Sequence, residues 1–290
     1  MKIQDYIVAG HRFRVILPKD SLIWEEMEQY RPFEAQAEGV PVFVLELVDK
    51  LRLNSPQPYF DQPTEPGETK IRIFRDGEDW YMESSVVEQA PVSMKLLVNS
   101  DFTYSKLEIA RPSQALFALN NALMLQYAFR TASLSTLEMH ASVVVNGGKG
   151  YLWLAKSGTG KSTHSRMWLE NIPGTLLLND DNPIVRVLEN GSVRVYGSPW
   201  SGKTPCYVNA DYPVGAFGHI VRAGYNKVTP LGKLDAYALV YSSSSGIKFY
   251  RPMADAMHGT LERVVGSVPC YTVECKAEPE AAAVCRESIV

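Results

Sequence analysis

The stretch YLWLAKSGTGKSTHSRMWL, residues 151–169, decides the fold of this chain. Its first four residues, 151–154, are apolar and predict a buried strand, and the residues from Lys161 onward predict a helix. The turn between them fits the phosphate-loop pattern, with Ala155 in the first glycine position and Gly-Lys-Ser at 160–162. A loop of this kind between a strand and a helix predicts a binding site for a nucleoside triphosphate; the alternative is a chance match in a strand–turn–helix.

Each residue type in this turn has a physical reason to be there. Gly158 and Gly160 lack a Cβ, so backbone N–H groups can curve around a polyphosphate. The helix that follows directs its free N–H groups at the same anion. Lys161 can reach the β- and γ-phosphates, and the Ser162 hydroxyl can bind Mg²⁺. We expect the nucleotide to contact Ala155, Lys156, Ser157, Gly158, Thr159, Gly160, Lys161, Ser162 and Thr163.

The composition excludes several classes of protein. The chain has 290 residues, 46% of them hydrophobic, and a formal charge of −3 with acids and bases interspersed, so we expect no nucleic-acid partner. No apolar run approaches membrane-spanning length, and the first residues lack a signal-peptide core. The four cysteines form no CxxC pair, which indicates reduced thiols and a cytoplasmic protein.

Residues 1–110 predict a strand-rich, antiparallel N-terminal region. It offers little chemistry of its own, and recognition of a substrate or partner is the role we expect for it. A proline-rich segment, residues 54–68, predicts a loop or an exposed excursion. The expected strands are residues 6–8, 13–16, 42–48, 71–74, 80–82, 94–98 and 104–109.

The second region, residues 111–290, begins with an apolar helix over residues 113–131. Residues 141–145 and 151–155 then predict a hairpin in which paired residue numbers sum to about 296. This register places His140 opposite the start of the phosphate loop, either as an acid/base or as a hydrogen-bonding positioner. A structural histidine at the end of a strand is the alternative.

A short strand over residues 175–178 ends in Asn179-Asp180-Asp181-Asn182. One carboxylate delivered by such a strand can hold Mg²⁺, and the other can accept the proton of an attacking hydroxyl. The alternative is an Asx turn, since Asn and Asp favour turns. A phosphate loop directly upstream favours the catalytic interpretation.

Two cationic residues further along the chain are candidates for neutralising phosphate charge. Lys203 lies in the loop GSPWSGKTPC, residues 197–206, which has the composition of an active-site loop or of an ordinary surface loop. Arg222 follows an expected strand over residues 215–221, and a simple salt bridge is its alternative role. The other expected elements are strands 184–188, 193–196 and 271–274 and helices 233–240, 254–265 and 279–289.

These motifs, taken in the order HASVVV, GGKGYLWLAKSGTGKST, LLNDDNP and YGSPWSGK, resemble the HPr kinase/phosphorylase C-terminal domain and the phosphoenolpyruvate carboxykinase-like superfamily. The resemblance covers residues 140–222 and is closest to bacterial HPr-kinase-like proteins. It implies an α/β nucleotide-binding fold with a mixed, largely antiparallel sheet. By this resemblance Asp180 would be the base, Asp181 and Ser162 would serve the metal, and His140 would line the site.

The chain departs from HPr kinases at two places. Thr163 stands where those enzymes usually have glutamate, and no counterpart of their glycine-rich segment follows the Asp pair. We therefore expect a kinase that uses Mg²⁺ and ATP, or another nucleoside triphosphate, and phosphorylates a hydroxyl of a protein, a peptide or a small molecule. A nucleotide-binding regulatory or scaffold protein, or an ATPase without an acceptor, is the alternative. The sequence leaves the oligomeric state open.

Overall fold

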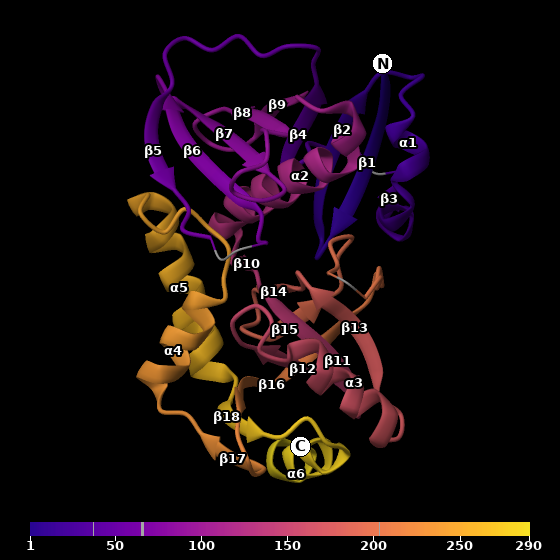
Figure 1. The fold of residues 1–290 in the computed structure, drawn as a ribbon, viewed down its shortest axis with the longest axis vertical. Coiled ribbons are helices and arrows are strands. Elements are labelled where there is room, and N and C mark those ends of the chain that lie inside the picture. Colours follow the sequence, from indigo (N-terminus) through magenta and orange to yellow (C-terminus); the bar gives the residue numbers. More distant parts are fainter. Residues whose placement is uncertain (37, 65–66, 203) are drawn as a thin grey trace. The chain divides into compact units, whose positions relative to one another are not determined.

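A computed structural model describes residues 1–36, 38–64, 67–202 and 204–290. The chain forms two compact units, Met1–Arg130 and Thr131–Val290 (Figure 1). Helix α2 (Ala115–Thr131), which we expected to open the second region, lies almost entirely in the first unit.

The first unit is built on one mixed sheet in the order β3-β1-β2-β4-β9-β8-β7-β6-β5. The hairpins β6–β7 and β8–β9 follow the prediction, and both are antiparallel. A short helix α1 (Ile23–Glu26) and a 3-10 helix (Glu28–Phe33) precede β3. The strands are β1 (Lys2–Val8), β2 (His11–Leu17), β3 (Glu34–Ala35), β4 (Phe43–Leu47), β5 (Gln57–Asp61), β6 (Lys70–Asp76), β7 (Asp79–Ser85), β8 (Met94–Val98) and β9 (Tyr104–Ile109).

Two expectations for this unit were wrong. The region is not wholly antiparallel, because β4 pairs in parallel with both β2 and β9. Long connections on both sides of β4 permit these crossovers, which short hairpin turns would not. The segment expected to be a loop or an exposed excursion contains strand β5, which is mostly exposed and is tolerated with Pro58 because it lies at the edge of the sheet.

Aromatic side chains fill the core of the first unit. Phe13 stacks on Phe43 with ring centroids 5.0 Å apart, and Tyr6 lies between Phe13 and Tyr30. Helix α2 joins this core through Tyr127, which is fully buried and donates a hydrogen bond to the Val8 carbonyl at 3.0 Å. Burial of such large rings supplies much of the hydrophobic free energy of a unit this size.

The second unit contains one mixed sheet that includes the hairpin β11–β12, and β12 leads into the 155–160 loop. The order is β10-β14-β15-β16-β12-β11-β13, with β18 beside β16 and β17 beside β18. Among the strand pairs of the described residues, β12–β16 and β16–β18 are parallel and the others are antiparallel, so the sheet is largely antiparallel, as expected. The strands are β10 (Thr136–Glu138), β11 (Ala141–Asn146), β12 (Lys149–Leu154), β13 (Leu176–Asp181), β14 (Ile184–Val187), β15 (Val193–Tyr196), β16 (Asp211–Arg222), β17 (Lys227–Pro230) and β18 (Cys270–Cys275). Sequence reasoning missed β10 and β17.

Helices α3 (Lys161–Asn171) and α6 (Pro279–Ile289) share one hydrophobic core with the sheet of the second unit. Trp168 of α3 packs against Trp153 and Tyr151 of β12, with ring centroids 5.2 and 5.3 Å apart. Helix α3 is thereby fixed against the strand that leads into it, which is the condition for a well-placed loop between them.

Two further helices, α4 (Lys233–Ser242) and α5 (Arg251–Ser267), pack against each other (Figure 1). Part of the segment between them, residues 243–245, bonds to the backbone that precedes β11: the Ser245 N–H donates to the Glu138 carbonyl at 2.9 Å. In the part of the chain that the structure describes, no helix combines the length and the apolar character needed to cross a membrane.

Candidate active site

The loop of residues 155–160 connects the end of β12 to the first residue of α3, as the sequence predicts. Gly158 and Gly160 have φ angles of 72° and 130°, which L residues with a side chain adopt only with strain. A Cβ at either position would meet no atom within 4 Å, so backbone conformation, rather than crowding, requires glycine here. The path of the chain around these two residues therefore depends on their freedom at positive φ.

Lys161, the first residue of α3, is turned back toward its own loop. Its side chain is buried, and the Nζ atom donates to the Ala155 carbonyl at 3.2 Å. The same Nζ lies 3.0 Å from Nε2 of His140. A buried ammonium group held at the mouth of a glycine-containing loop provides the positive charge that a bound phosphate would require.

His140 reaches this position because of the hairpin register. Ala141 pairs with Leu154, so paired residue numbers sum to 295 and the preceding histidine lies beside the start of the loop. The backbone N–H of His140 donates to the Ser243 carbonyl at 2.7 Å, which fixes the residue from the α4–α5 segment. The predicted proximity of His140 to the loop is correct.

One ring nitrogen of His140 faces two partners. Nε2 lies 3.2 Å from Oδ1 of Asp181 and 3.0 Å from Nζ of Lys161. Without a proton Nε2 can accept from the lysine, and with a proton it can donate to the carboxylate. The side chains of His140 and Asp181 are 43% and 38% exposed, so both are open to a ligand and to solvent protons.

Asp180 and Asp181 are the last residues of β13, and they differ in environment. Asp180 is 4% exposed, and its carbonyl accepts a hydrogen bond from Gly202 N–H at 2.6 Å. Its charge adds to burial in raising the pKa of the neighbouring Cys206 thiol to about 11. Asp181 has a φ of 142°, an unusual conformation for a residue other than glycine, and this strained backbone lies where the side chain meets His140.

Asn179, one residue earlier, fixes the loop that follows β15. Its Nδ2 donates to the Trp200 carbonyl at 3.0 Å and to Oγ of Ser198 at 3.1 Å. Ser198 in turn donates to the Asn182 carbonyl at 2.6 Å. Asn179 and Asn182, on the two sides of the Asp pair, are thus tied to the 198–200 segment through buried Ser198, a network that residue-by-residue reading of the sequence did not find.

Arg222 contacts the 155–160 loop, and among the described residues it forms no ion pair with a carboxylate. Its Nε donates to the Thr159 carbonyl at 2.8 Å, and its Nη2 donates to the Gly158 carbonyl at 2.5 Å. The side chain is exposed at the end of β16. Arg222 therefore holds the loop backbone from outside while leaving its charge beside the space that a phosphate would occupy.

Two cavities open beside the loop, on the side where Arg222 stands. One, of about 440 Å³, is lined by Thr163, Met167 and Ile220 among others. The second, of about 520 Å³, is lined by the 155–159 loop and residues 219–222. Thr159, Ile220 and Arg222 line both cavities, so the two lie next to each other beside the loop.

Two predicted site residues take no part in the contacts described above. Ser162 is exposed at the first turn of α3. Lys203 lies outside the residues that the structure describes. No group of three or more His, Cys, Asp or Glu side chains that could hold a metal occurs in residues 1–36, 38–64, 67–202 and 204–290.

Two buried titratable groups near the site were not found from the sequence. Glu138 is 1% exposed, and burial, with the nearby charge of Asp181, raises its pKa well above the ordinary value. His164 on α3 accepts a hydrogen bond from Nε1 of Trp168 at 3.1 Å, and burial lowers its pKa to about 4. Their burial depends on tertiary packing, so no local motif indicates it.

Comparison with known proteins gives a distant likeness in fold. No family model matches the chain, and no curated protein matches it. Among solved structures, the Hpr(Ser) kinase/phosphatase from Coxiella burnetii is similar at 14% sequence identity and a TM-score of 0.32. That match covers 52% of this chain and 95% of that chain.

Proposed function

We propose that this chain binds a nucleoside triphosphate with Mg²⁺ on its 155–162 loop and transfers the γ-phosphoryl group to a hydroxyl. The acceptor would be a serine of a protein or peptide, or a small molecule. The observation that carries the proposal is the meeting of Lys161, His140 and Asp181, at 3.0 and 3.2 Å, beside a loop with two glycines at positive φ. Phosphoryl transfer requires this combination of positioning and charge neutralisation.

The nucleotide would lie across the start of α3. Backbone N–H groups of the loop and Nζ of Lys161 would bind the β- and γ-phosphates, and the cavities beside Arg222 offer room for the base and ribose. The lysine would exchange its present bond to the Ala155 carbonyl for a phosphate oxygen.

The site suits a magnesium ion that arrives with the nucleotide. Mg²⁺ takes most of its ligands from phosphates and water and one or two from the protein. Ser162 and Asp181 would supply those protein oxygens, at the helix start and at the end of β13 respectively. The ion would stabilise the negative charge that develops on the phosphate oxygens.

The transfer itself needs a proton acceptor for the attacking hydroxyl. As its oxygen bonds to the γ-phosphorus, the bond from that phosphorus to the leaving diphosphate breaks, and the hydroxyl proton passes to a carboxylate. We assign this role to Asp180, with His140 positioning the phosphate or relaying the proton. Lys203 and Arg222 would add positive charge.

Asp180 is 4% exposed, and this burial favours the alternative in which no phosphoryl group is transferred to an acceptor. A carboxylate without access to an acceptor suits a nucleotide-binding regulatory protein or an ATPase. In that case nucleotide binding would remain and no phosphorylated acceptor would form.

Calorimetric titration with ATP and Mg²⁺ tests the proposal at its first step. Lys161→Ala should weaken binding by about ten- to a hundredfold, because a charge-assisted phosphate contact is lost. Lys149→Ala, on the exposed β11–β12 turn, is the matched control and should bind like the wild type. Absence of binding by the wild type would reject the proposed function outright.

Labelled ATP then separates the alternatives. Asp180→Asn should abolish phosphoryl transfer while nucleotide affinity stays within about threefold of the wild type, because the base acts only in the chemical step. Asp181→Asn should instead raise the Mg²⁺ concentration needed for half-maximal binding of the nucleotide. Free phosphate without a labelled acceptor would identify an ATPase.

A further inference from the structure

The cavity of about 440 Å³ beside the 155–160 loop lies at the ends of two parallel strands. Strands β16 and β18 pair in parallel and end at Arg222 and Cys275. Ala223, Lys276 and Ala277, which directly follow these ends, line the cavity, and we call it the β16–β18 cavity. In open α/β sheets, ligands bind outside the carboxyl ends of parallel strands. This cavity therefore has the position of a ligand site.

The residues that would bind phosphate direct a nucleotide toward this cavity. Gly160, at the end of the loop, and Thr163, in the first turn of α3, both line it. Nζ of Lys161 lies against His140, which precedes β11, and β11 pairs with β12 on the side opposite to β16. A triphosphate whose γ-phosphate meets Lys161 and His140 would therefore extend its nucleoside toward β16 and β18.

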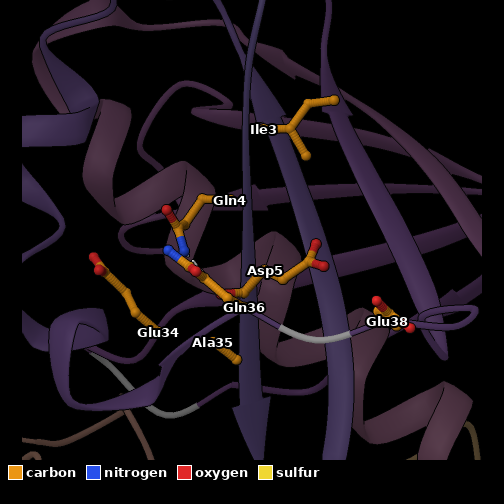
Figure 2. Close-up of a pocket in the computed structure, with 7 residues that line it drawn as sticks. All are labelled: Ile3, Gln4, Asp5, Glu34, Ala35, Gln36 and Glu38. Carbon is orange, nitrogen blue, oxygen red and sulfur yellow. Dashed lines mark hydrogen bonds between the residues drawn. The ribbon is translucent and has the colours of Figure 1, made fainter.

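Two other cavities suit a nucleoside less well. The one of about 520 Å³ is lined by the 155–159 loop and residues 219–222, and none of its described lining residues belongs to α3. The one of about 760 Å³ lies in the first unit, where Figure 2 shows the carboxylates of Glu34 and Glu38 at its wall. Their negative charges would repel a nucleotide.

The walls of the β16–β18 cavity offer apolar contact but few groups that distinguish one base from another. Methionine, isoleucine and alanine side chains line it, and its described lining includes no Asp, Glu, Asn or Gln. The Ala223 N–H already donates to the Cys275 carbonyl at 3.1 Å. The Lys276 N–H already donates to Oδ1 of Asn226 at 3.0 Å. Guanine differs from adenine in N–H donors that a carboxylate or amide oxygen would have to accept, and no lining side chain supplies one.

We propose that the β16–β18 cavity holds the nucleoside of the triphosphate and accepts adenine and guanine alike. The inference rests on the proposed function, since it takes the triphosphate to lie on the 155–162 loop. The base would lie against the apolar wall. Lys276, whose Nζ lies 3.5 Å from Oε1 of Glu278 in a half-exposed pair, would donate to N7, an acceptor that both purines carry. A site that covers a base without pairing with its distinguishing donors discriminates weakly between bases.

Calorimetric titration of the full chain with Mg·ATP and with Mg·tripolyphosphate separates the nucleoside from the phosphates. Ala223→Phe narrows the β16–β18 cavity, so it should weaken Mg·ATP binding at least about tenfold while tripolyphosphate binding stays within about threefold of the wild type. The matched control is Val221→Phe, at a position that is also half-buried but lines the 520 Å³ cavity, and it should bind Mg·ATP like the wild type.

The outcomes separate this inference from the proposed function. If the wild type binds neither ligand, the proposed function fails and the inference fails with it. If the wild type binds both and Ala223→Phe binds Mg·ATP as tightly, the inference alone is overturned. Mg·GTP should bind the wild type within about tenfold of Mg·ATP, and a larger ratio would contradict the equal acceptance of both bases.

A second measurement needs no variant. Photolysis of the wild type with 8-azido-ATP, followed by mass mapping of the peptides, should place the label on Ala223, Lys276 or Ala277. Label on His219 or Val221 would instead assign the base to the 520 Å³ cavity and overturn the inference.

Discussion

Nε2 of His140 lies 3.0 Å from Nζ of Lys161, so the histidine that precedes the first strand of the hairpin contacts the lysine that begins α3. The same Nζ bonds to the Ala155 carbonyl, so Lys161 links both ends of the 155–160 loop to His140. Because the same histidine nitrogen lies 3.2 Å from Asp181, its proton decides whether the lysine or the carboxylate is its partner.

This geometry makes His140→Gln an informative variant. If the imidazole transfers a proton, phosphoryl transfer should fall by about a hundredfold or more while the dissociation constant for ATP changes by less than about threefold. Steady-state kinetics and calorimetry on the same preparation measure both quantities. A lowered melting temperature with unchanged turnover would instead assign His140 a structural role.

Arg222→Ala should loosen the phosphate loop without unfolding the protein. The variant loses the bonds to the Gly158 and Thr159 carbonyls, but the side chain is exposed and contributes little to the core. We expect about tenfold weaker ATP binding and faster hydrogen exchange of the loop amides. Arg222→Lys keeps the charge but lacks the forked pair of donors. Suppose that Arg222→Lys binds ATP as tightly as the wild type while its loop amides exchange as fast as those of Arg222→Ala. The charge of residue 222 would then contribute to ATP affinity separately from the hydrogen bonds that position the loop.

The lowered pKa of buried His164 predicts that the protein loses stability in mild acid. Its pKa is lowered to about 4 from 6.5, so the unfolded chain binds a proton before the native protein does. The stability that comes from keeping His164 neutral in the native protein is fully present above pH 6.5. It is lost as the pH falls toward 4, and the free energy of unfolding is lower by about 3 kcal/mol once His164 is protonated in both states. Denaturant unfolding of wild type and His164→Gln across pH 4–7 measures it. Parallel pH profiles would contradict the prediction.

Glu138 predicts the opposite pH dependence, because its pKa is raised. The native protein holds this proton when the unfolded chain has already released it, so stability falls as the pH rises above the ordinary glutamate range. Glu138→Gln removes the titration while preserving shape, and it should be more stable than the wild type at neutral pH. Glu189→Gln, in the exposed β14–β15 turn, serves as the control and should follow the wild-type profile.

Local sequence patterns were sufficient to predict the hairpin, the loop and α3. Each of these signals is a pattern of a few residues: the alternation of side chains in the strands, the turn at 146–150, and the glycines at 158 and 160. The register of the hairpin follows from its turn. The placement of His140 followed from the same register. These features require no knowledge of the rest of the chain.

Nonlocal features could not be predicted in this way. The parallel pairing of β4 with β2 and β9 joins segments separated by long connections, and many such arrangements share one hydrophobic pattern. The bonds from Arg222 to the loop and the burial of Glu138 likewise depend on strands that meet only in the folded unit. The catalytic roles of Asp180 and Asp181, and that of Lys203, stay predictions.

The pairing of β16 with three other strands affects how the second unit folds during synthesis. Strand β16 pairs with β15 near its start, with β12 in its middle, and with β18 at its end, where Arg222 lies opposite Cys275. During synthesis, the end of β16 has no partner until residues 270–275 have left the ribosome. Pairing across so many residues carries a large loop-closure entropy and slows folding. A nascent chain ending before β18 would therefore hold the hairpin and the loop, but would lack the neighbour that sets Arg222 against them.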